Sequence, residues 1–330
     1  MITGAIDRRI DRLLDLLVEN ATVVVSGGKM ADHIGVARST IWRWVEKLRA
    51  MSVDIRGHTG AGYQLKKLPD ILLPSLVRKH FRAEQIGHRV VHYFRTESTN
   101  SDAMRLAGEG EPHGTVVLAE EQTAGRGRFG RSWYSERSSG IYLSVILRPP
   151  LTPSHAPMLS LMAGLAVREA IHSATGLQAD IRWPNDLLFG KKKVCGILTE
   201  MSAEVDRLHY VIVGIGINVN HLKIPSELTR IATSLRLQGK REYSRLAILI
   251  ALLRALEQYY RLLLAEGPGA VAERWGAASS FASGKRIRVK IPSEEFKATT
   301  LTLEPSGALR FRRDDGREES LLSAEIIEVK

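Results

Sequence analysis

Hydrophobic residues recur at two different spacings along the chain, and each spacing predicts a different kind of element. A period of three to four residues near the N-terminus predicts an amphipathic helix, whose apolar stripe is Ile10, Leu13, Leu14, Leu17 and Val18. The same period predicts two long helices, over residues 158–174 and 243–264. Short apolar runs are typical of buried strands, and they cover residues 90–94, 115–119, 141–147, 195–201 and 210–219.

A helix-turn-helix pattern follows the first helix. A short helix over Lys29–Ile34 ends at a turn at Gly35, and a third helix opens at Arg38 or Ser39. This third helix buries an apolar stripe of Ile41, Val45 and Leu48 and leaves the opposite face polar. We expect that face to contact the major groove or the flanking phosphates of DNA. The predicted contact residues are Arg38, Ser39, Thr40, Arg43 and Lys47.

Two short strands come next, Val53–Arg56 and Tyr63–Leu65, and a turn that holds Gly57, Gly60 and Gly62 separates them. This pattern predicts a β-hairpin. A helix pair followed by a hairpin predicts a winged helix-turn-helix DNA-binding domain over residues 1–68. A small helical protein-interaction domain is the alternative. Trp42 fits either interpretation, because it can touch DNA or pack on the next domain.

Two further units complete the predicted organisation. Residues 69–270 mix strands with helices, which predicts a catalytic domain built on a mixed sheet with helices on one face. Residues 271–330 alternate apolar and polar positions between turns, which predicts a small SH3-like β-barrel. The expected fold class is therefore multidomain α/β (α+β), with a winged helix-turn-helix, a central mixed-sheet domain with helices and a C-terminal barrel.

Composition changes this picture only slightly. The chain has 330 residues, of which 44% are hydrophobic and 25% charged, as in ordinary globular proteins. Its formal net charge of +11 favours a polyanionic partner such as nucleic acid. However, residues 1–68 hold only eleven Lys and Arg against seven Asp and Glu, a net charge of +4. The DNA-binding prediction therefore rests on the motif rather than on charge.

Several absences narrow the class of protein. No apolar run approaches the roughly 20 residues that span a bilayer, and the N-terminus lacks the apolar core of a signal peptide. Cys195 is the single cysteine, which excludes an internal disulfide and a cysteine-based zinc site. We therefore expect a cytoplasmic protein without membrane contact, and we assign no metal-ligating residues.

The candidate chemistry is concentrated in the loop Gly125–Trp133, which we call the Arg/Gly loop. Glycine lets the backbone approach a ligand closely, and the planar arginine fork matches carboxylate and phosphate oxygens. Such a loop suits a small anion or a nucleotide. It contains G-x-G-x-x-G, but no amphipathic helix follows Gly130, which excludes the dinucleotide-binding fingerprint. A protein kinase is excluded because its other motifs are missing.

Other polar patches share the central unit with this loop. Ser98-Thr99-Asn100 offers hydroxyl and amide groups that can bind a small ligand or cap a helix. Arg182–Leu187 reads as an extended, proline-stiffened segment that leads into Lys193–Leu198. Gly214–Val219 is a strand with glycines at alternate positions. Glycines of this kind mark the close approach of a ligand or another backbone.

These motifs together resemble the biotin–protein ligases, in particular the bifunctional kind that also represses the biotin operon. The family's G-R-G-R-x-G-R-x-W matches Gly125–Trp133, and its K-W-P-N-D-L matches Arg182–Leu187. K-x-x-G-I-L, G-I-G-I-N-V and S-T-N match Lys193–Leu198, Gly214–Val219 and Ser98–Asn100. The resemblance spans the whole chain, including the winged helix and the terminal barrel.

The resemblance implies a two-step reaction. Biotin and ATP, with Mg²⁺, form biotinyl-5′-adenylate and pyrophosphate, and a lysine of the biotin carboxyl carrier protein of acetyl-CoA carboxylase then attacks the adenylate. The first step brings two anions together, so cations must screen their repulsion. The implied catalytic residues are Arg126, Arg182, Asp186 and Lys193. The implied ligand-binding residues are Ser98, Thr99, Asn100, Gln122, Gly125, Arg126, Gly127, Arg128, Trp133, Asn185, Lys193, Gly196, Gly214, Gly216 and Asn218.

The resemblance also assigns roles within this set. Arg126 is implied to grip the biotin carboxylate and the adenylate phosphate, and Lys193 to hold phosphate. The residues implied to bind the ureido ring are Ser98, Thr99 and Gln122. The residues implied to contact adenine are Trp133, Asn185 and Asn218, and those that leave space are Gly196, Gly214 and Gly216. Asp186 is implied to orient a lysine or to assist metal binding.

Two positions depart from the family pattern. Phe129 stands where a bifunctional member carries another arginine, which removes one positive charge from the loop. Arg182 replaces the lysine that commonly opens W-P-N-D, so the charge is kept while the geometry changes. We expect effects on how tightly the intermediate is held and on the rate or pH dependence of transfer.

The resemblance also implies partners. The adenylate acts as corepressor and promotes a homodimer through the central sheet, which places two winged helices on a palindromic operator. The carrier protein uses the same surface. One alternative is a biotin sensor that has lost ligation, but the Arg/Gly loop and Lys193 are intact. Another is a ligase for lipoate or octanoate, against which the polar set Ser98, Thr99 and Gln122 argues.

Overall fold

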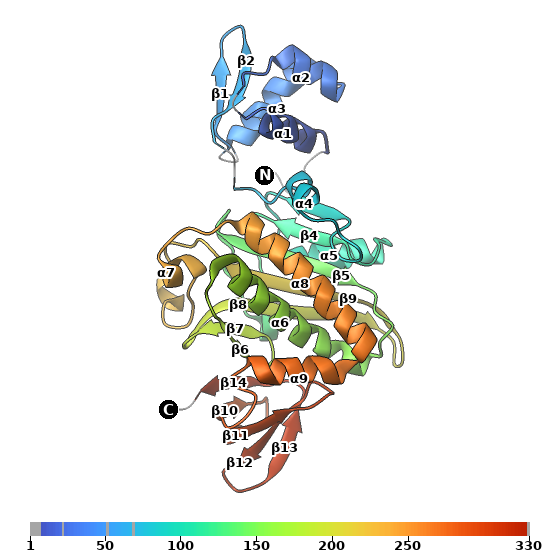
Figure 1. The fold of residues 1–330 in the computed structure, drawn as a ribbon, viewed down its shortest axis with the longest axis vertical. Coiled ribbons are helices and arrows are strands. Elements are labelled where there is room, and N and C mark those ends of the chain that lie inside the picture. The colour runs from blue at the N-terminus through green and yellow to red at the C-terminus, as the bar shows by residue number, and fades with distance from the viewer. Residues whose placement is uncertain (1–7, 22, 51–52, 68–69, 329–330) are drawn as a thin grey trace.

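The computed structural model describes residues 8–21, 23–50, 53–67 and 70–328. Its elements form three groups along the longest axis of the molecule, as Figure 1 shows. A helix-rich group lies at one end, a large sheet with its helices in the middle, and a smaller sheet at the other end. The predicted boundary between residues 68 and 69 lies outside the described residues.

The first group is a helix-turn-helix with a hairpin, as predicted. Its helices are α1 (Arg8–Glu19), α2 (Gly27–Ile34) and α3 (Arg38–Ala50). The Ser26 hydroxyl caps α2 by accepting from the Lys29 amide, and Gly35 ends the helix in the left-handed conformation at φ 77°. The stripe residues meet in a separate core that includes Leu13, Leu17, Met30, Ile41, Val45 and Leu48.

The hairpin differs from its prediction by two residues. The strands are β1 (Ile55–His58) and β2 (Gly62–Leu65). Val53 is buried but precedes the strand, and Gly57 pairs with Tyr63 inside the ladder rather than lying in the turn. The predicted strand Val53–Arg56 was therefore placed too early. Gly60, at φ 73°, does lie in the turn, where a residue with positive φ is needed.

The central sheet has seven strands in the order β3-β4-β5-β9-β8-β7-β6. Among these strands only β3 and β4 run parallel, so the predicted mixed sheet is confirmed. Each predicted strand is present. The bounds are β3 (Val90–Tyr93), β4 (Val116–Ala119), β5 (Gly140–Leu147), β6 (Asp180–Arg182), β7 (Asp186–Phe189), β8 (Lys192–Ala203) and β9 (Leu208–Asn218).

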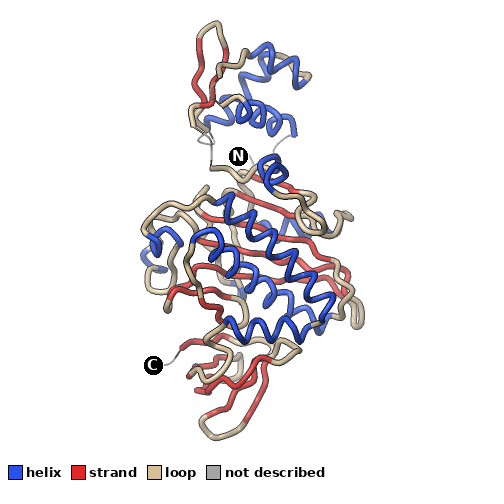
Figure 2. Tube along the Cα trace, viewed as in Figure 1, coloured by secondary structure: helices blue, strands red, loops and turns tan. Residues whose placement is uncertain are grey.

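Helices cover both faces of this sheet, so the expectation of helices on one face was wrong. The two long predicted helices, α6 (Ala156–Thr175) and α8 (Arg245–Glu266), lie side by side on one face, as Figure 2 shows. The opposite face carries α5 (Thr99–Gly108). Strand side chains alternate between faces, so a second apolar set packs against Ala103 and Ala107 of α5, namely Val117, Ala119, Ile146 and Ile212.

The segment Arg182–Leu187 is a hairpin rather than an extended stretch. Strand β6 ends at Arg182 and β7 begins at Asp186, and these two residues pair across the turn. Trp183 at the turn is only 2% exposed, and its indole Nε1 donates to the Gly307 carbonyl at 3.0 Å. The chain therefore turns at Trp183, under the C-terminal unit, at the point where the proline predicted an extended segment.

The C-terminal unit is a five-stranded antiparallel sheet in the order β13-β12-β11-β10-β14. Its strands are β10 (Arg286–Lys290), β11 (Glu295–Leu303), β12 (Leu309–Arg313), β13 (Glu318–Leu321) and β14 (Glu325–Glu328). In the described residues β13 and β14 form the two edges, so closure into an SH3-like barrel stays a prediction.

Helix α4 (Pro74–His80) follows the first group, α7 (Leu235–Gly239) lies between β9 and α8, and α9 (Pro268–Ala278) precedes the C-terminal sheet. Helix α9 spans the predicted boundary at residue 270. Its fully buried Trp275 belongs to one core that continues from α6 and α8 to the inner residues of the C-terminal sheet. Within the described part of the chain, no helix combines the length and the apolarity needed to cross a membrane.

Candidate active site

A small cavity lies on the α5 face of the central sheet, where the sequence motifs meet. It is lined by Ser98, Thr99, Asn100, Gln122, Arg126, Gly127, Arg128, Trp133, Leu143, Asn185, Lys193, Gly196, Ile197, Leu198, Gly214, Ile215 and Gly216. Most of the predicted ligand-binding residues are in this set. Four predicted residues do not line the cavity, namely Gly125, Arg182, Asp186 and Asn218.

A continuous chain of hydrogen bonds runs through the polar end of the cavity. The Gln122 Oε1 accepts from the Thr99 amide at 2.9 Å and from the Thr99 hydroxyl at 3.1 Å. The Ser144 hydroxyl lies 2.8 Å from Thr99 Oγ1 and 2.6 Å from Asn100 Oδ1. Asn100 in turn donates from Nδ2 to Glu200 Oε2 at 2.7 Å. This chain pre-orients polar groups in a mostly buried setting.

Sequence reasoning missed two members of this chain. Ser144 is a serine inside the apolar strand Gly140–Leu147, and that isolated polar residue was a usable signal. Glu200 offered no such signal, because it lies in the outer half of β8 beside other polar residues, Thr199 and Ser202. Only the approach of α5 to β8 brings Asn100 and Glu200 together.

The S-T-N motif lies at the start of α5. Its position fits a helix cap, and its side chains also line the cavity. Ser98 occupies the N-cap position but makes no side-chain capping hydrogen bond. Ser98 is 4% exposed and lines the cavity. Its hydroxyl is therefore positioned by the helix end without being used to cap it.

The strand glycines make room for side chains of the protein itself. A methyl group on Gly216 would collide with the Trp133 indole, and one on Gly214 would collide with the Asn100 amide. Trp133 also lies against Gly196, and the Lys193 Nζ is 5.2 Å from the centre of its ring. The expectation that these glycines admit a ligand or another backbone needs this correction, since Trp133 and Asn100 take the space here.

Lys193 is held at the cavity by a buried carboxylate. Its Nζ lies 2.5 Å from Asp186 Oδ1, and Arg182 donates to Asp186 Oδ2 at 2.6 Å. Burial alone raises the pKa of Asp186, but the charges of Lys193 and Arg182 outweigh it and lower that pKa below its ordinary value. Asp186 is therefore an ionised orienting group, and Arg182 acts on it rather than on the cavity.

The C-terminal sheet braces the Arg/Gly loop. Arg128 donates to Asn185 Oδ1 at 3.1 Å and to the Ser323 hydroxyl at 2.5 Å, and Arg131 pairs with Glu325 at 2.6 Å. Phe129 at the loop tip is 64% exposed with φ 57°, an unusual value for an aromatic residue. Arg126 is left as the loop arginine whose side chain points to the α5 end of the cavity.

The two asparagines predicted to read adenine have backbone partners. Asn185 donates from Nδ2 to the Ile197 carbonyl at 2.7 Å and also lines the cavity. Asn218 donates to the Thr233 carbonyl at 3.0 Å, which ties the end of β9 to the segment before α7. In this structure Asn218 therefore positions a neighbouring loop and does not face the cavity.

The predicted DNA-contacting residues share the outer face of α3. Arg38, Ser39, Arg43 and Lys47 are exposed, and Thr40 is half-buried with its hydroxyl 3.3 Å from the Arg43 guanidinium. The inner stripe is fully buried, as predicted: Ile41, Val45 and Leu48. Trp42 is 57% exposed, so its side chain lies largely in solvent on the surface of α3.

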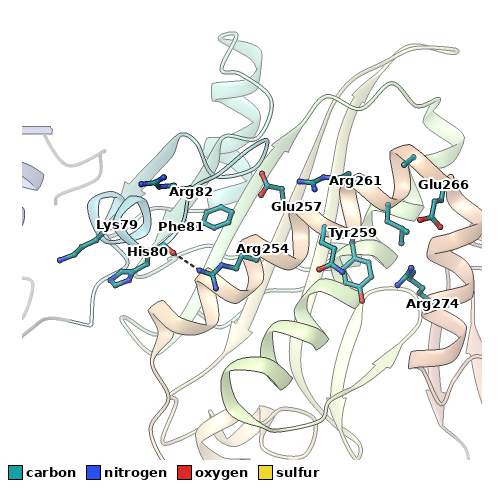
Figure 3. A pocket seen from close by; sticks show the side chains of 13 residues that line it. Lys79, His80, Phe81, Arg82, Arg254, Glu257, Tyr259, Arg261, Glu266 and Arg274 are labelled. Carbon is teal, nitrogen blue, oxygen red and sulfur yellow. Dashed lines mark hydrogen bonds between the residues drawn. The ribbon is translucent and has the colours of Figure 1, made fainter.

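A larger cavity of about 920 Å³ lies on the opposite side of the sheet. Figure 3 shows it between α4, the second half of α8 and α9, with Arg82, Arg254 and Arg274 around it. None of the motif residues lines it. Size alone is therefore a poor guide here, and the small polar cavity is the candidate active site.

The fold and this site define a protein ligase joined to a helix-turn-helix domain. Residues 93–218 match the Biotin/lipoate A/B protein ligase family, and residues 9–64 match an HTH domain. The chain is 35% identical to the Bifunctional ligase/repressor BirA of Bacillus subtilis, over 95% of this chain and 97% of that protein. It is 28% identical to the protein of the same name from Escherichia coli, over 91% and 94%.

A solved structure agrees. The biotin protein ligase from Aquifex aeolicus in complex with biotin and ATP is 27% identical, with a TM-score of 0.65, over 73% of this chain and 100% of that chain. The chain therefore belongs to the biotin–protein ligase family, in its bifunctional ligase and repressor form. It is an enzyme of that class that also carries a DNA-binding type of domain.

Proposed function

We propose that the polar cavity binds biotin and ATP and joins them as biotinyl-5′-adenylate. The observation that carries this proposal is that Arg126, Arg128 and Lys193 line the same cavity as the hydrogen-bond chain of Thr99, Gln122 and Asn100. Neutral polar groups suit a ureido ring, and the cations suit a carboxylate beside an α-phosphate. The Aquifex aeolicus structure contains biotin and ATP in the same fold.

The proposed chemistry is a nucleophilic substitution at phosphorus. A carboxylate oxygen of biotin attacks the α-phosphorus, the α–β anhydride bond breaks, and pyrophosphate leaves. Arg126 and Lys193 stabilise the negative charge that is brought together in this step. The ε-amine of a carrier lysine then attacks the acyl carbon, AMP leaves, and an amide forms with loss of a proton. The proposed acceptor is the biotin carboxyl carrier protein of acetyl-CoA carboxylase.

The cavity must open before both substrates fit. It measures about 40 Å³, whereas pockets for small ligands measure roughly 300–1,000 Å³. Trp133 fills the space above Gly196 and Gly216, and its buried Nε1 has no acceptor within the described residues. We therefore assign Trp133 to move aside on binding and to stack on adenine.

Mg²⁺ is proposed to enter with the phosphates of ATP. Among the described residues no group of three or more His, Cys, Asp or Glu side chains converges on one point. Mg²⁺ is commonly held by one or two carboxylates together with substrate phosphates. Asp186 is the carboxylate near Lys193, and its occupied oxygens leave it at most a minor share.

The test is incubation of the purified chain with ATP, Mg²⁺, labelled biotin and a carrier domain. Lys193→Ala and Arg126→Ala should each lower adenylate formation by about 10²- to 10³-fold, measured by ATP–pyrophosphate exchange. Lys192→Ala is the matched control, because Lys192 is exposed at the start of the same strand. If both site variants exchange pyrophosphate at the wild-type rate, the proposed site is wrong.

We also propose that α3 binds operator DNA and that the adenylate promotes a homodimer, which matches the two-fold symmetry of an operator. In this proposal residues 1–68 bind DNA, 69–270 catalyse, and 271–330 form a barrel that braces the Arg/Gly loop. Arg43→Ala should weaken binding of random-sequence duplex DNA and reduce its salt slope by about one. Arg12→Ala, an exposed arginine on α1, is the control. Equal salt slopes for the two variants would contradict the assignment of α3 to DNA binding. The homodimer is tested separately, by comparing the sedimentation of the protein with and without biotin plus ATP.

A further inference from the structure

Glu200 is a charged residue at the edge of the cavity that none of the motifs contains. It lies on β8 two positions beyond Leu198, and it pairs in register with Ile212, whose side chain belongs to the α5 face. Its carboxylate is 3.2 Å from the Arg126 guanidinium. The cation assigned to the substrate carboxylate therefore already holds a carboxylate of the protein.

The contacts of Glu200 are unequal in strength. The Asn100 amide donates to Glu200 Oε2 at 2.7 Å, and Ser144 fixes that amide from a buried position. The Arg126 pair is more open, because the side chain of Arg126 is 45% exposed and that of Glu200 is 26% exposed. Glu200 is thus anchored on the sheet, whereas Arg126 reaches it from a loop.

With these contacts, a substrate carboxylate would replace Glu200 on Arg126 rather than bind Arg126 together with Glu200. When Arg126 turns away, Glu200 keeps the Asn100 amide as its partner, so its release leaves no unpaired buried carboxylate. An incoming carboxylate that binds beside Glu200 on one guanidinium would meet a like charge at close range. An incoming carboxylate that replaces Glu200 avoids that repulsion.

We propose that Glu200 is a placeholder carboxylate, which holds Arg126 in the unliganded enzyme and yields it to the carboxylate of the substrate. This proposal rests on the proposed function, since it takes biotin as the ligand of Arg126. Glu200 is a positioning residue, because it acts on the substrate only through Arg126. It lowers the affinity for ligands that carry a carboxylate and leaves the affinity for their neutral analogues unchanged.

The experiment compares two ligands by titration calorimetry on the full-length chain. The ligands are biotin and its neutral primary amide, which lacks the negative charge. Glu200→Gln keeps the acceptor for Asn100 and removes the competing charge. We expect this variant to bind biotin about two- to fivefold more tightly, the size of a partly exposed ion pair, and to bind the amide with unchanged affinity. Glu204→Gln is the matched control on the same hairpin, because Glu204 is 69% exposed and pairs with His209.

A second background tests whether the gain passes through Arg126. In Arg126→Gln, adding Glu200→Gln should leave biotin affinity unchanged. Weaker or equal biotin binding by Glu200→Gln alone, or an equal gain for the amide, overturns the placeholder role while the proposed function stands. If the wild-type chain binds neither ligand, the proposed function fails, and the role of Glu200 fails with it.

Discussion

The two faces of the central sheet are built from the same strands and do different work. On β9, the residues Val211, Val213, Ile215 and Ile217 pack against the side of α6 and α8. The alternate positions Ile212, Gly214 and Gly216 lie on the side of α5 and the cavity. The face under α6 and α8 is a continuous apolar core. The face toward α5 has glycines where the candidate active-site cavity lies.

This difference separates stability from chemistry within single strands. The face under α6 and α8 also contains a buried carboxylate, Glu120, which continues the inward alternation of Val116 and Leu118 on β4. It is neutralised by Arg245 at the start of α8, at 2.8 Å, and Arg245 also holds Asp70 in the segment that leads from the first group. We therefore expect the buried Glu120–Arg245 pair to matter for stability, and the glycines on the cavity face to matter for activity.

The largest effect is expected from a substitution in the core under α6 and α8. Arg245→Met leaves Glu120 buried without its cation, which should lower the free energy of unfolding by about 3–5 kcal/mol. Burial raises the pKa of Glu120, but Arg245 and His92 lower it to about 2 overall. The pair therefore stabilises the fold above pH 4.5 and loses its contribution as the pH falls toward 2. Urea denaturation measures both, and a loss below 1 kcal/mol for Arg245→Met contradicts the claim.

A smaller effect of pH is expected on the cavity face. His221 is fully buried beside Tyr142, with its Nε2 3.2 Å from the Tyr142 hydroxyl. Burial, followed by the charge of Arg245, lowers the pKa of His221 from 6.5 to about 4. The unfolded chain binds this proton first, so stability should fall by about 3 kcal/mol as the pH drops from 6.5 to 4. His221→Gln should flatten the stability profile in that pH window, and His209→Gln, at a half-buried histidine on the same strand, β9, should not. Identical pH profiles would refute the assignment.

The smallest effects are expected from substitutions at two adjacent residues of β9, one on each face of the sheet. Gly216→Ala places a methyl group against Trp133, so adenylate formation should fall by on the order of 10- to 100-fold through misplacement of that side chain. Ile217→Val removes one methylene from the core under α6 and α8 and should cost about 0.5–1.5 kcal/mol of stability with unchanged activity. Pyrophosphate exchange and thermal unfolding on both variants sharpen the comparison. A shared loss of activity would show that the two faces are coupled.

Much of the fold was predictable because burial follows local periodicity. The helices over 158–174 and 243–264 and the five predicted strands are present within a few residues of their expected bounds. The errors have a common origin in tertiary contact. The supposed extended segment is a hairpin whose turn residue, Trp183, donates its indole hydrogen to the distant Gly307 carbonyl. Helix α5 was not foreseen on the second face because its apolar stripe is short.

The candidate site shows the same division. The Arg/Gly loop and the strand glycines marked the cavity because unusual residue types stand at close spacing. Several partners of the predicted site residues came from elsewhere in the chain, as Glu325 for Arg131 and Glu200 for Asn100 show. Pairings across 194 positions, such as Arg131 with Glu325, leave no periodic trace in a sequence.

Residue order along the chain decided which elements form and which of their faces are apolar, because helix and strand periods are local properties. It also decided the inventory of charges and glycines from which a biotin–protein ligase site is made. Only the tertiary structure decided that Trp133 fills the space above Gly196 and Gly216, that Arg182 pairs with Asp186, and that Glu200 pairs with Arg126. Those facts depend on side chains that meet across the sheet, and distance in space is not written in the spacing of residues.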